Sequence, residues 1–284
     1  MLELNSLMQE KQDEREFGYC ADDFSRVRKL IHLKAGIFLS ETKSGMVYNR
    51  LSRHLRSWGI SSFKQYLDQL EYVNDSEQWQ FFTNALTTNL TSFFREAHHF
   101  PILADYMLNA AGPIRIWCSA ASSGEEAYSI AMTACEAFGT MTPPVEVIAS
   151  DIDTSMLAIA ARGVYANERM NKLSEQQRKQ FFLRGNGQHS GSVKVRDELR
   201  KLITFQPLNL LDNYWFHTTA FDVIFCRNVM IYFDKPTQSK ILSRFIPLMK
   251  KDGLLFAGHS ENYMFISNDF KLRGKSVYQL NNRV

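Results

Sequence analysis

The apolar and polar positions along the chain predict two kinds of structure in succession. From Asp22 to Leu86, apolar residues recur every three or four positions, which is the spacing of amphipathic helices. From about residue 114, short apolar and β-branched runs alternate with helical patterns, as in a parallel sheet whose strands are joined by helices. The pattern therefore predicts a helical domain followed by a larger α/β domain.

Changes in this pattern set the expected domain boundaries. Residues 1–18 are polar and aperiodic and are expected to be a disordered tail, followed by a helical domain at 19–86, a linker at 87–100 and the α/β domain at 101–284. Within the last, three glycines and short β-patterned pieces predict a small antiparallel insert at about 181–205. A helix is expected from about Lys235 to Met249, then a strand in GLLFAGHSEN, and FKLRGKSVYQLN predicts a hairpin that adds an antiparallel strand at the sheet edge.

The helix expected from about Lys43 to Trp58 has two distinct faces. Its apolar residues fall within one arc of about 80°, and its basic residues fall in the adjacent arc. The apolar set is Val47, Leu51, Leu55 and Trp58, and the basic set is Arg50, Arg53 and His54. A basic helix face is often simply solvated, but this one would also suit an acidic helical partner or phosphates, and the sequence leaves these readings open.

The stretch IRIWCSAASSGEEAYSIAM, Ile114 to Met132, reads as strand, tight turn and helix. In an open α/β sheet a ligand lies beyond the carboxyl end of the strand, and the small residues of this turn would let the backbone approach it. A dinucleotide site would need G-x-G-x-x-G, whereas this turn has one glycine and the two acids Glu125 and Glu126. Two carboxylates repel a phosphate and suit hydroxyls, an amino group or a sulfonium. They would also favour the helix dipole, and the pattern leaves Glu125 and Glu126 equally eligible.

Two further strand ends carry candidate chemistry. VEVIASDID ends in Asp151 and Asp153; an acid there can accept hydrogen bonds from ribose hydroxyls, although Asp153 resembles a helix N-cap. After the strand FDVIFC comes a turn with Arg227 and Asn228, where a nucleic-acid amine methylase would carry an Asn/Asp-Pro-Pro-aromatic turn. These donors suit an anionic acceptor such as a carboxylate.

Composition excludes several classes of protein. Hydrophobic residues make up 45% of the chain, charged residues 22%, and the net charge is +3, so no global field marks it for nucleic acid. No apolar run approaches the roughly 18 residues of a membrane span, and the charged N-terminus does not resemble a signal peptide, so a cytoplasmic protein without membrane insertion is expected. The four scattered cysteines and the adjacent His98 and His99 predict no metal site.

Several motifs taken together resemble those of one family. TNLTSFFRE, SSGEEAYSIAM, SDIDT, LNLL, FCRNVMIYFDK and LLFAGHSEN are similar to the CheR family, the chemotaxis receptor glutamate methyltransferases, over nearly the whole chain. The resemblance implies a Rossmann-like sheet that uses S-adenosylmethionine and leaves S-adenosylhomocysteine. It also implies a monomeric enzyme, without a metal, that esterifies glutamates in the cytoplasmic helices of methyl-accepting chemotaxis receptors.

The same resemblance implies roles for individual residues. Arg95 and Tyr232 would orient the acceptor carboxylate, and Glu126 rather than Glu125 would contact the cofactor. The full set of implied cofactor contacts is Asn89, Thr91, Arg95, Glu126, Asp151, Asn209, Leu210, Arg227 and Asn228.

Two implied sites concern the receptor. Arg50 and Arg53 of the basic helix would dock the glutamate-rich methylation region. The loop GNGQHSG, with Gly185, Gly187 and Gly191, would mark a member that tethers to a pentapeptide at the receptor's C-terminus, by adding the peptide as an edge strand.

Overall fold

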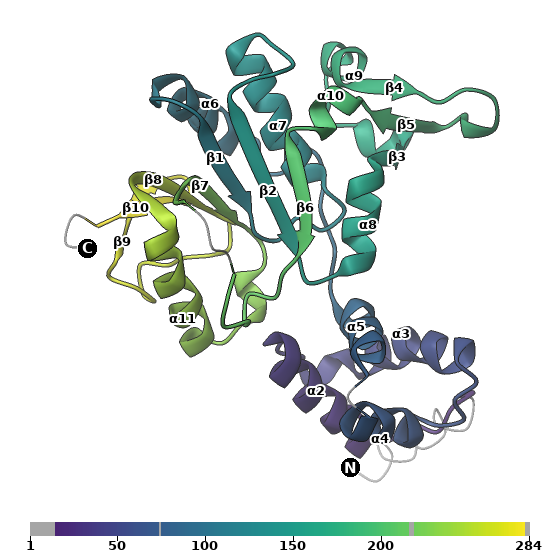
Figure 1. Ribbon diagram of the computed structural model, residues 1–284. Coiled ribbons are helices and arrows are strands. Elements are labelled where there is room, and N and C mark those ends of the chain that lie inside the picture. The colour runs from purple at the N-terminus through teal and green to yellow at the C-terminus, as the bar shows by residue number, and fades with distance from the viewer. Residues whose placement is uncertain (1–14, 74, 216–218, 282–284) are drawn as a thin grey trace. The chain divides into compact units, whose positions relative to one another are not determined.

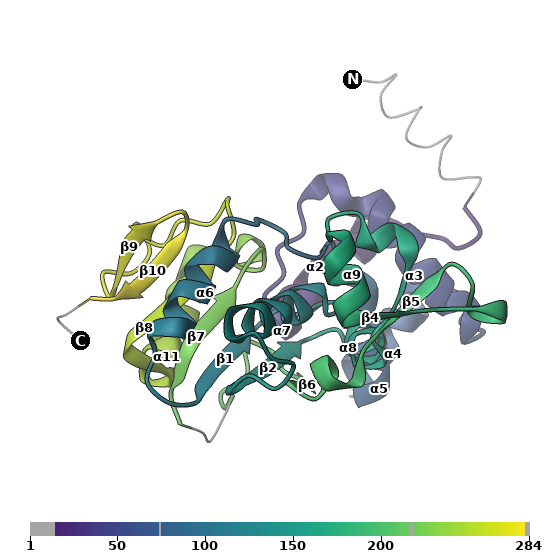
Figure 2. The same cartoon turned by 90° about the horizontal axis from the view of Figure 1, so that it is seen from above.

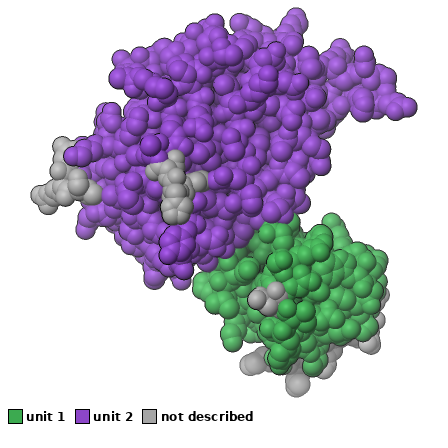
Figure 3. Space-filling view, in the orientation of Figure 1, with its two compact units in different colours: residues 1–88 green, residues 89–284 purple. Residues whose placement is uncertain are grey.

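The computed structural model describes residues 15–73, 75–215 and 219–281, so most of the predicted tail lies outside the described residues. The chain divides into two compact units, residues 1–88 and 89–284, coloured separately in Figure 3. Residues from 89 onward, expected to form a linker, therefore belong to the second unit. Within the described ranges, no helix combines the length and apolar character needed to cross a membrane.

The first unit is built from helices (Figure 1). They are α2 (Ala21–Ala35), the 3-10 turn η1 (Glu41–Lys43), α3 (Ser44–Ser57), α4 (Phe63–Val73) and α5 (Ser76–Leu86). Each of the main helices buries an apolar face. Helix α2 contacts α4 and α5, and α3 contacts α5. The predicted apolar face of α3 is buried at Val47, Leu51 and Leu55, and Gly59 follows the helix with a φ of 65°. Phe17, within the predicted tail, is also buried.

The second unit contains a seven-stranded sheet in the order β6-β2-β1-β7-β8-β10-β9. The strands are β1 (Ile114–Cys118), β2 (Val145–Asp151), β6 (Ile203–Pro207), β7 (Phe221–Cys226), β8 (Met249–Ala257), β9 (Phe270–Gly274) and β10 (Val277–Leu280). The first five named in the sheet order are parallel, and β10 and β9 form the predicted antiparallel hairpin at the edge.

Successive side chains of the central strands enter two separate cores, as the alternation along a strand requires. Ile116 and Val223 face the core under α6 (His99–Asn109) and α7 (Glu125–Phe138), the pair seen side by side in Figure 2. Trp117 and Ile224 face the opposite core, which is shared with α11 (Lys235–Phe245). Helix α8 (Thr154–Arg162) packs against β2 and β6. Burial of both faces explains the continuous apolar runs in these strands.

A smaller antiparallel sheet, in the order β3-β5-β4, projects from one end of this unit (Figure 1). Its strands are β3 (Val164–Ala166), β4 (Phe182–Arg184) and β5 (Ser192–Val195). The connections contain the 3-10 turns η2 (Asn167–Met170) and η3 (Gly187–His189) and the helix α9 (Glu175–Phe181), and α10 (Asp197–Arg200) follows β5. The small sheet begins before the predicted insert of about 181–205, because β3 lies earlier, and β6, at the C-terminal end of that range, belongs to the main sheet. A three-residue strand is too short to show a period of two.

The last helix is shorter than its pattern predicts. It ends at Phe245, a 3-10 turn η5 (Ile246–Leu248) follows, and β8 begins at Met249. Pro247 explains the difference, because it has no N–H for the helix ladder and its ring would clash with the carbonyl of Ser243 four residues earlier.

The site is positioned by the order of the strands. The chain runs outward from β1 to β2 on one side and from β7 to β8 on the other, so the direction of winding changes between β1 and β7. A crevice for ligands forms at such a switch point, beyond the carboxyl ends of the strands.

Candidate functional site

The turn after β1 begins the site. Ser122 has a φ of 48° and Gly124 a φ of 97°, so both are left-handed. The Ser122 N–H donates to Oδ2 of Asp151 over 2.7 Å, which joins this turn to the end of β2. A Cβ on Gly124 would lie 2.7 Å from Cβ of Ala160 in α8. The glycine is therefore required by its own backbone conformation and by the packing of α8.

The acids after β2 have different roles. Asp151 is buried and accepts N–H groups from Ser122 and Asp153, yet burial raises the pKa of its carboxyl to about 6. Asp153 is the N-cap of α8, as its position in the sequence suggested, and accepts the Ser155 N–H. It also accepts the side-chain amide of Asn89 over 2.8 Å. Asn89 thus closes the linker onto this strand end.

Arg227, at the end of β7, is the centre of a buried ionic cluster. Its side chain is 1% exposed; Nη1 donates to Glu126 and Nη2 lies 3.2 Å from Oε2 of Glu96. Nη2 also donates to the main-chain oxygen of Arg95 over 2.6 Å. The Cys118 thiol donates to Oε1 of Glu126. The structure thus separates Glu126, which faces this cluster, from Glu125.

Burial and charge oppose each other in this cluster. Burial alone would lower the pKa of Arg227, but the carboxylates of Glu126 and Glu96 raise it above its ordinary value. Burial raises the pKa of Glu126, and the guanidinium acts in the opposite direction. A buried pair of this kind depends on both partners, because removal of one leaves an uncompensated charge.

The linker is strained where it meets the cluster. Phe94 and Glu96 have φ values of 49° and 55°, which residues other than glycine rarely adopt. The half-buried Arg95 between them donates from Nη1 to the carbonyl of Leu90 over 2.8 Å. Strain of this kind persists only where surrounding contacts fix it, and it gathers at functional sites.

The loop after β7 carries the remaining predicted side chains of the cluster. Asn228 has a φ of 59°, and its amide Nδ2 donates to Oε1 of Glu96 over 3.3 Å. Tyr232 is half-buried in the turn η4 (Met230–Tyr232), and its hydroxyl makes no hydrogen bond with any residue that the structure describes. Arg227 and Asn228 together connect this loop to the segment that carries Arg95.

The other predicted cofactor contacts lie outside the ionic cluster. The Thr91 carbonyl accepts from Arg169 over 3.5 Å. Oδ1 of Asn209 accepts the Leu211 N–H in the loop after β6, and Leu210 is buried in the core shared with α11.

Three glutamates make buried contacts that the sequence did not predict. Glu125 is fully buried, and its carboxylate pairs with Arg169 over 2.6 Å, so it is more than a helix-start acid. Glu96 pairs with Arg227, and Glu261 braces the loop after β7. Sequence spacing gives no sign of these pairings, although Glu96 and Glu261 stand inside the motifs TNLTSFFRE and GHSEN.

One group of possible metal ligands lies beside the cluster. Within the described part of the chain, Glu96, His98 and His99 bring ligand atoms within 4.8 Å of one another. Glu96 is already paired with Arg227, whose positive charge opposes a second cation, and Nε2 of His99 bonds the carbonyl of Lys275. We therefore assign no metal role to this group.

In the first unit the two predicted docking residues differ. Nη1 of Arg50 donates to the carbonyls of Ala85 and Thr87, at 3.2 and 2.5 Å, so it satisfies the end of α5. Arg53 is exposed on α3. Of the two, Arg53 is the side chain that remains available to a partner.

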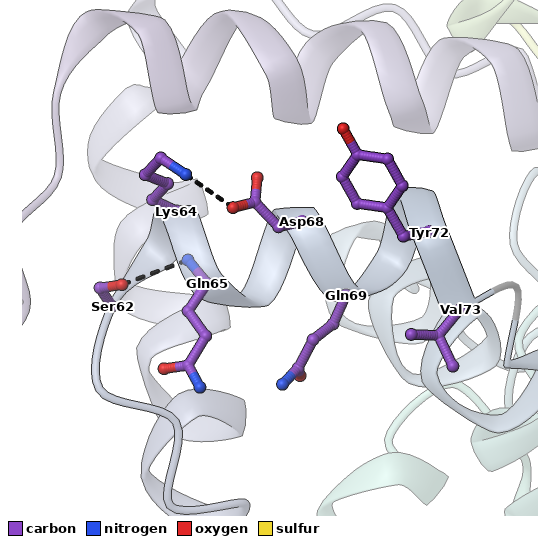
Figure 4. Close-up of a pocket in the computed structure, with 7 residues that line it drawn as sticks. All are labelled: Ser62, Lys64, Gln65, Asp68, Gln69, Tyr72 and Val73. Carbon is purple, nitrogen blue, oxygen red and sulfur yellow. Dashed lines mark hydrogen bonds and ion pairs between the residues drawn. The ribbon is translucent and has the colours of Figure 1, made fainter.

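A shallow hollow lies on the surface of α4, with Lys64 paired to Asp68 over 2.7 Å (Figure 4). Its lining residues are Ser62, Lys64, Gln65, Asp68, Gln69, Tyr72 and Val73. None of the predicted site residues lines it.

The predicted glycine loop forms the tip of the hairpin between β4 and β5. Gly187 and Gly191 have φ values of 54° and 90°. A Cβ on Gly185 would lie 2.1 Å from the carbonyl oxygen of His189. Only glycine fits that position, and β4 is left as an edge strand of the small sheet.

Comparison with known proteins decides the family. Residues 89–278 match the family described as CheR methyltransferase, SAM binding domain, and residues 22–87 match CheR methyltransferase, all-alpha domain. The chain belongs to the CheR methyltransferase family. The resemblance seen in its motifs is confirmed, and the second unit is an adenosylmethionine-binding methyltransferase domain.

Similar chains are found in distant bacteria. The chain is 53% identical over 257 residues to the Chemotaxis protein methyltransferase of Escherichia coli (strain K12), which covers 90% of each chain. It is 49% identical over 267 residues to Chemotaxis protein methyltransferase 2 of Pseudomonas aeruginosa, covering 93% of this chain and 95% of that one. A Chemotaxis protein methyltransferase of Borreliella burgdorferi is 36% identical over 251 residues, or 84% and 88% of the two chains.

The chemistry of the site fits adenosylmethionine. Glu96 and Glu126 contribute two carboxyl groups against one buried guanidinium, that of Arg227, and Asp151 adds a third carboxyl group at the end of β2. The excess of negative charge favours a sulfonium and an ammonium over a phosphate. Nε of Arg227 is buried and makes no hydrogen bond with any described residue, which leaves a donor for the cofactor's carboxylate.

Proposed function

We propose that this chain transfers methyl groups from adenosylmethionine to glutamate side chains in the cytoplasmic helices of methyl-accepting chemotaxis receptors, forming methyl esters. One observation carries the proposal: relatives named Chemotaxis protein methyltransferase align over about nine-tenths of this chain and of their own length. The acid-rich turn and the arginine and asparagine of the loop after β7 support it, because they suit a cationic donor and an anionic acceptor.

Methyl transfer to a glutamate requires little acid–base catalysis from the protein. When bound, adenosylmethionine supplies a sulfonium methyl group, and its transfer to a glutamate needs no general base because that side chain, with a pKa near 4.3, is ionised at pH 7. The residues of the site have to align the acceptor and exclude water, since water stabilises separated charges better than the transition state in which they cancel.

In this proposal the cofactor is held at the strand ends. Asp151 accepts ribose hydroxyls, Asn209 and Leu210 lie at the adenine, and Glu126 faces the amino group. Asn89, Thr91, Arg95, Arg227 and Asn228 complete the set.

Arg95 and Tyr232 orient the acceptor carboxylate through a charge-assisted hydrogen bond and a phenol hydroxyl. Support comes from the two contacts that Arg227 and Asn228 make with the segment of Arg95, because they hold the two loops together. The interaction of Arg95 with the acceptor carboxylate has to be moderate in strength, since a tight ion pair would lower the nucleophilicity of that carboxylate.

Two surfaces would bring the receptor to the site. Arg53 on α3 offers a cation to the glutamate-rich helices. The exposed edge of β4 offers backbone groups to a C-terminal receptor peptide, which would extend the small sheet by one strand.

The decisive experiment incubates the protein with methyl-labelled adenosylmethionine and membranes that carry the receptors. Label should enter the receptor band and be released as methanol by mild base, as a carboxyl ester requires. Membranes without receptors are the control. A base-stable label, or label in nucleic acid, would contradict the proposal.

A further inference from the structure

A buried carboxylate lies behind the loop after β7. Glu261, 6% exposed, follows β8. Its Oε2 accepts the N–H groups of Asn228 and Gly258 over 2.9 and 2.6 Å, and its Oε1 accepts the N–H of Met230 over 2.8 Å. No lysine, arginine or histidine among the described residues pairs with Glu261. Its charge is balanced by backbone dipoles alone, and those dipoles belong to two loops of the site.

The backbone that Glu261 holds has an intrinsically unfavourable conformation at Asn228. Asn228 is left-handed, and a Cβ at Gly258 would lie 2.4 Å from Nδ2 of Asn228 and 2.8 Å from Oε2 of Glu261. The two loops therefore pack without spare room around the carboxylate. A strained residue of this kind needs surrounding contacts that fix it.

Glu261 restrains only one half of the loop after β7. Arg227 is held separately, by Glu126 and by the carbonyl of Arg95. Glu261 instead fixes the main chain at Asn228 and Met230, two residues before Tyr232. Asn228 keeps a second restraint, the hydrogen bond from its side-chain amide to Glu96, so the loss of Glu261 should be felt most at Tyr232, on the acceptor side of the site.

We propose that Glu261 is a positioning residue for methyl transfer, which acts by holding the backbone that presents Tyr232 to the acceptor carboxylate. The inference rests on the proposed function for the identity of that acceptor. Burial raises the pKa of Glu261 while the backbone N–H groups oppose that shift, in keeping with a carboxylate whose partners are main-chain donors.

The first test is Glu261→Gln, which keeps the shape but turns an NH₂ group toward N–H donors. We expect kcat for receptor methylation to fall about tenfold or more, the size of one lost hydrogen bond to a charged group, with the dissociation constant for adenosylhomocysteine changed less than about threefold. Glu198→Gln, at an exposed glutamate of α10, is the matched control and should change neither quantity.

A double-mutant cycle with Tyr232→Phe separates positioning from general stability. If Glu261 acts through Tyr232, Glu261→Gln should lower kcat by less than about threefold further once the hydroxyl is gone. Additive losses, or a fall in kcat matched by an equal loss of cofactor affinity and of folded protein, would overturn the proposal.

Two measurements keep the inference testable if Glu261→Gln folds poorly or the substrate differs. Gly258→Ala, whose Cβ would push on both Glu261 and the side chain of Asn228, should lower kcat at least as much as Glu261→Gln, and unchanged turnover would count against the inference. Amide exchange at Asn228, Met230 and Gly258 should speed up in Glu261→Gln. If wild-type protein leaves receptors unmethylated, the proposed function fails alone, and the exchange result still decides whether Glu261 holds the loop.

Discussion

Arg227 donates a hydrogen bond of 2.6 Å to the main-chain oxygen of Arg95, which lies 132 residues earlier in the chain. One buried guanidinium thus joins the end of β7, the start of α7 through Glu126, and the strained segment before α6. The relationship links the stability of the unit to the geometry of its site.

Arg227→Ala should destabilise the methyltransferase domain by about 3–5 kcal/mol, because Glu126 and Glu96 would stay buried without their cation. Urea unfolding of the full chain, followed by tryptophan fluorescence that includes the buried Trp117, measures the change. Lys179→Ala, which removes an exposed pair with Glu175, is the control and should have little effect. An equally small effect of Arg227→Ala would mean that the cluster relaxes on its own.

Tyr232→Phe should lower receptor methylation about tenfold and Arg95→Ala about 100-fold, the range for lost hydrogen bonds to a charged acceptor. Calorimetry should show a modest loss of cofactor affinity in Tyr232→Phe. Tyr214→Phe removes a hydroxyl at an exposed position of the same unit and should leave turnover unchanged. Full turnover in both site variants would remove Arg95 and Tyr232 from the mechanism.

Cofactor affinity should depend on pH through Asp151, whose pKa burial raises to about 6. Ribose hydroxyls donate to the ionised carboxylate, so affinity for adenosylhomocysteine should weaken below pH 6, by up to about tenfold for each unit. Calorimetry across pH 5 to 8 measures the slope, and Asp151→Asn should flatten it. An unchanged slope in that variant would assign the dependence to another group.

Protonation of Asp151 should weaken cofactor binding, but it should stabilise the folded state of the cofactor-free protein. The folded pKa of Asp151 lies above the ordinary value of 3.8, so the folded chain holds the proton more tightly than the unfolded chain. The contribution of Asp151 to stability should therefore be present below about pH 4 and be lost as the pH rises through 6.

Arg53→Glu should raise the KM for receptors and leave adenosylhomocysteine binding intact, because Arg53 is exposed on α3. The effect should shrink at high salt, as screening predicts. Lys240→Glu, the same charge change on the exposed side of α11, is the control. Arg50→Glu should instead lower the melting temperature of the first unit, since the carbonyls of Ala85 and Thr87 lose their donor.

Gly185→Ala should abolish binding of a receptor C-terminal peptide that contains Trp and Phe, because its Cβ would meet the carbonyl of His189 and open the hairpin. Calorimetric titration of the full-length protein measures this. Gly45→Ala, at a position with open space around it, should bind the peptide as the wild type does. A wild-type protein that ignores the peptide would refute the tether.

The periodic parts of the fold could be predicted from the sequence. The apolar face of α3, the continuous runs of β2 and β7 and the closing hairpin depend on local spacing, and the structure confirms each. The extra turn of helix expected after Phe245 was wrong because Pro247 outweighs a favourable pattern. The three-residue strand β3 gave no readable period.

The partners of polar residues could not be predicted in this way. Nothing in the spacing of Arg227 shows that it binds the backbone of residue 95, and nothing in a basic helix face shows that Arg50 bonds carbonyls of α5. The left-handed residues Phe94, Glu96 and Asn228 are equally invisible, since each is held by contacts from distant segments. The resemblance to the CheR family pointed to the site residues, and the structure identified their hydrogen-bond partners.

The segment from Asn89 to His98 joins two domains in the sequence, but it takes part in the fold of only one of them. Its amide, backbone and acid are bonded to Asp153, Arg227 and Asn228. A fragment that begins at residue 101 would bury an arginine without its carbonyl and a strand end without its amide. The second unit on its own should therefore be stable only if it begins at or before Asn89, so that these ten residues remain with the sheet they are bonded to.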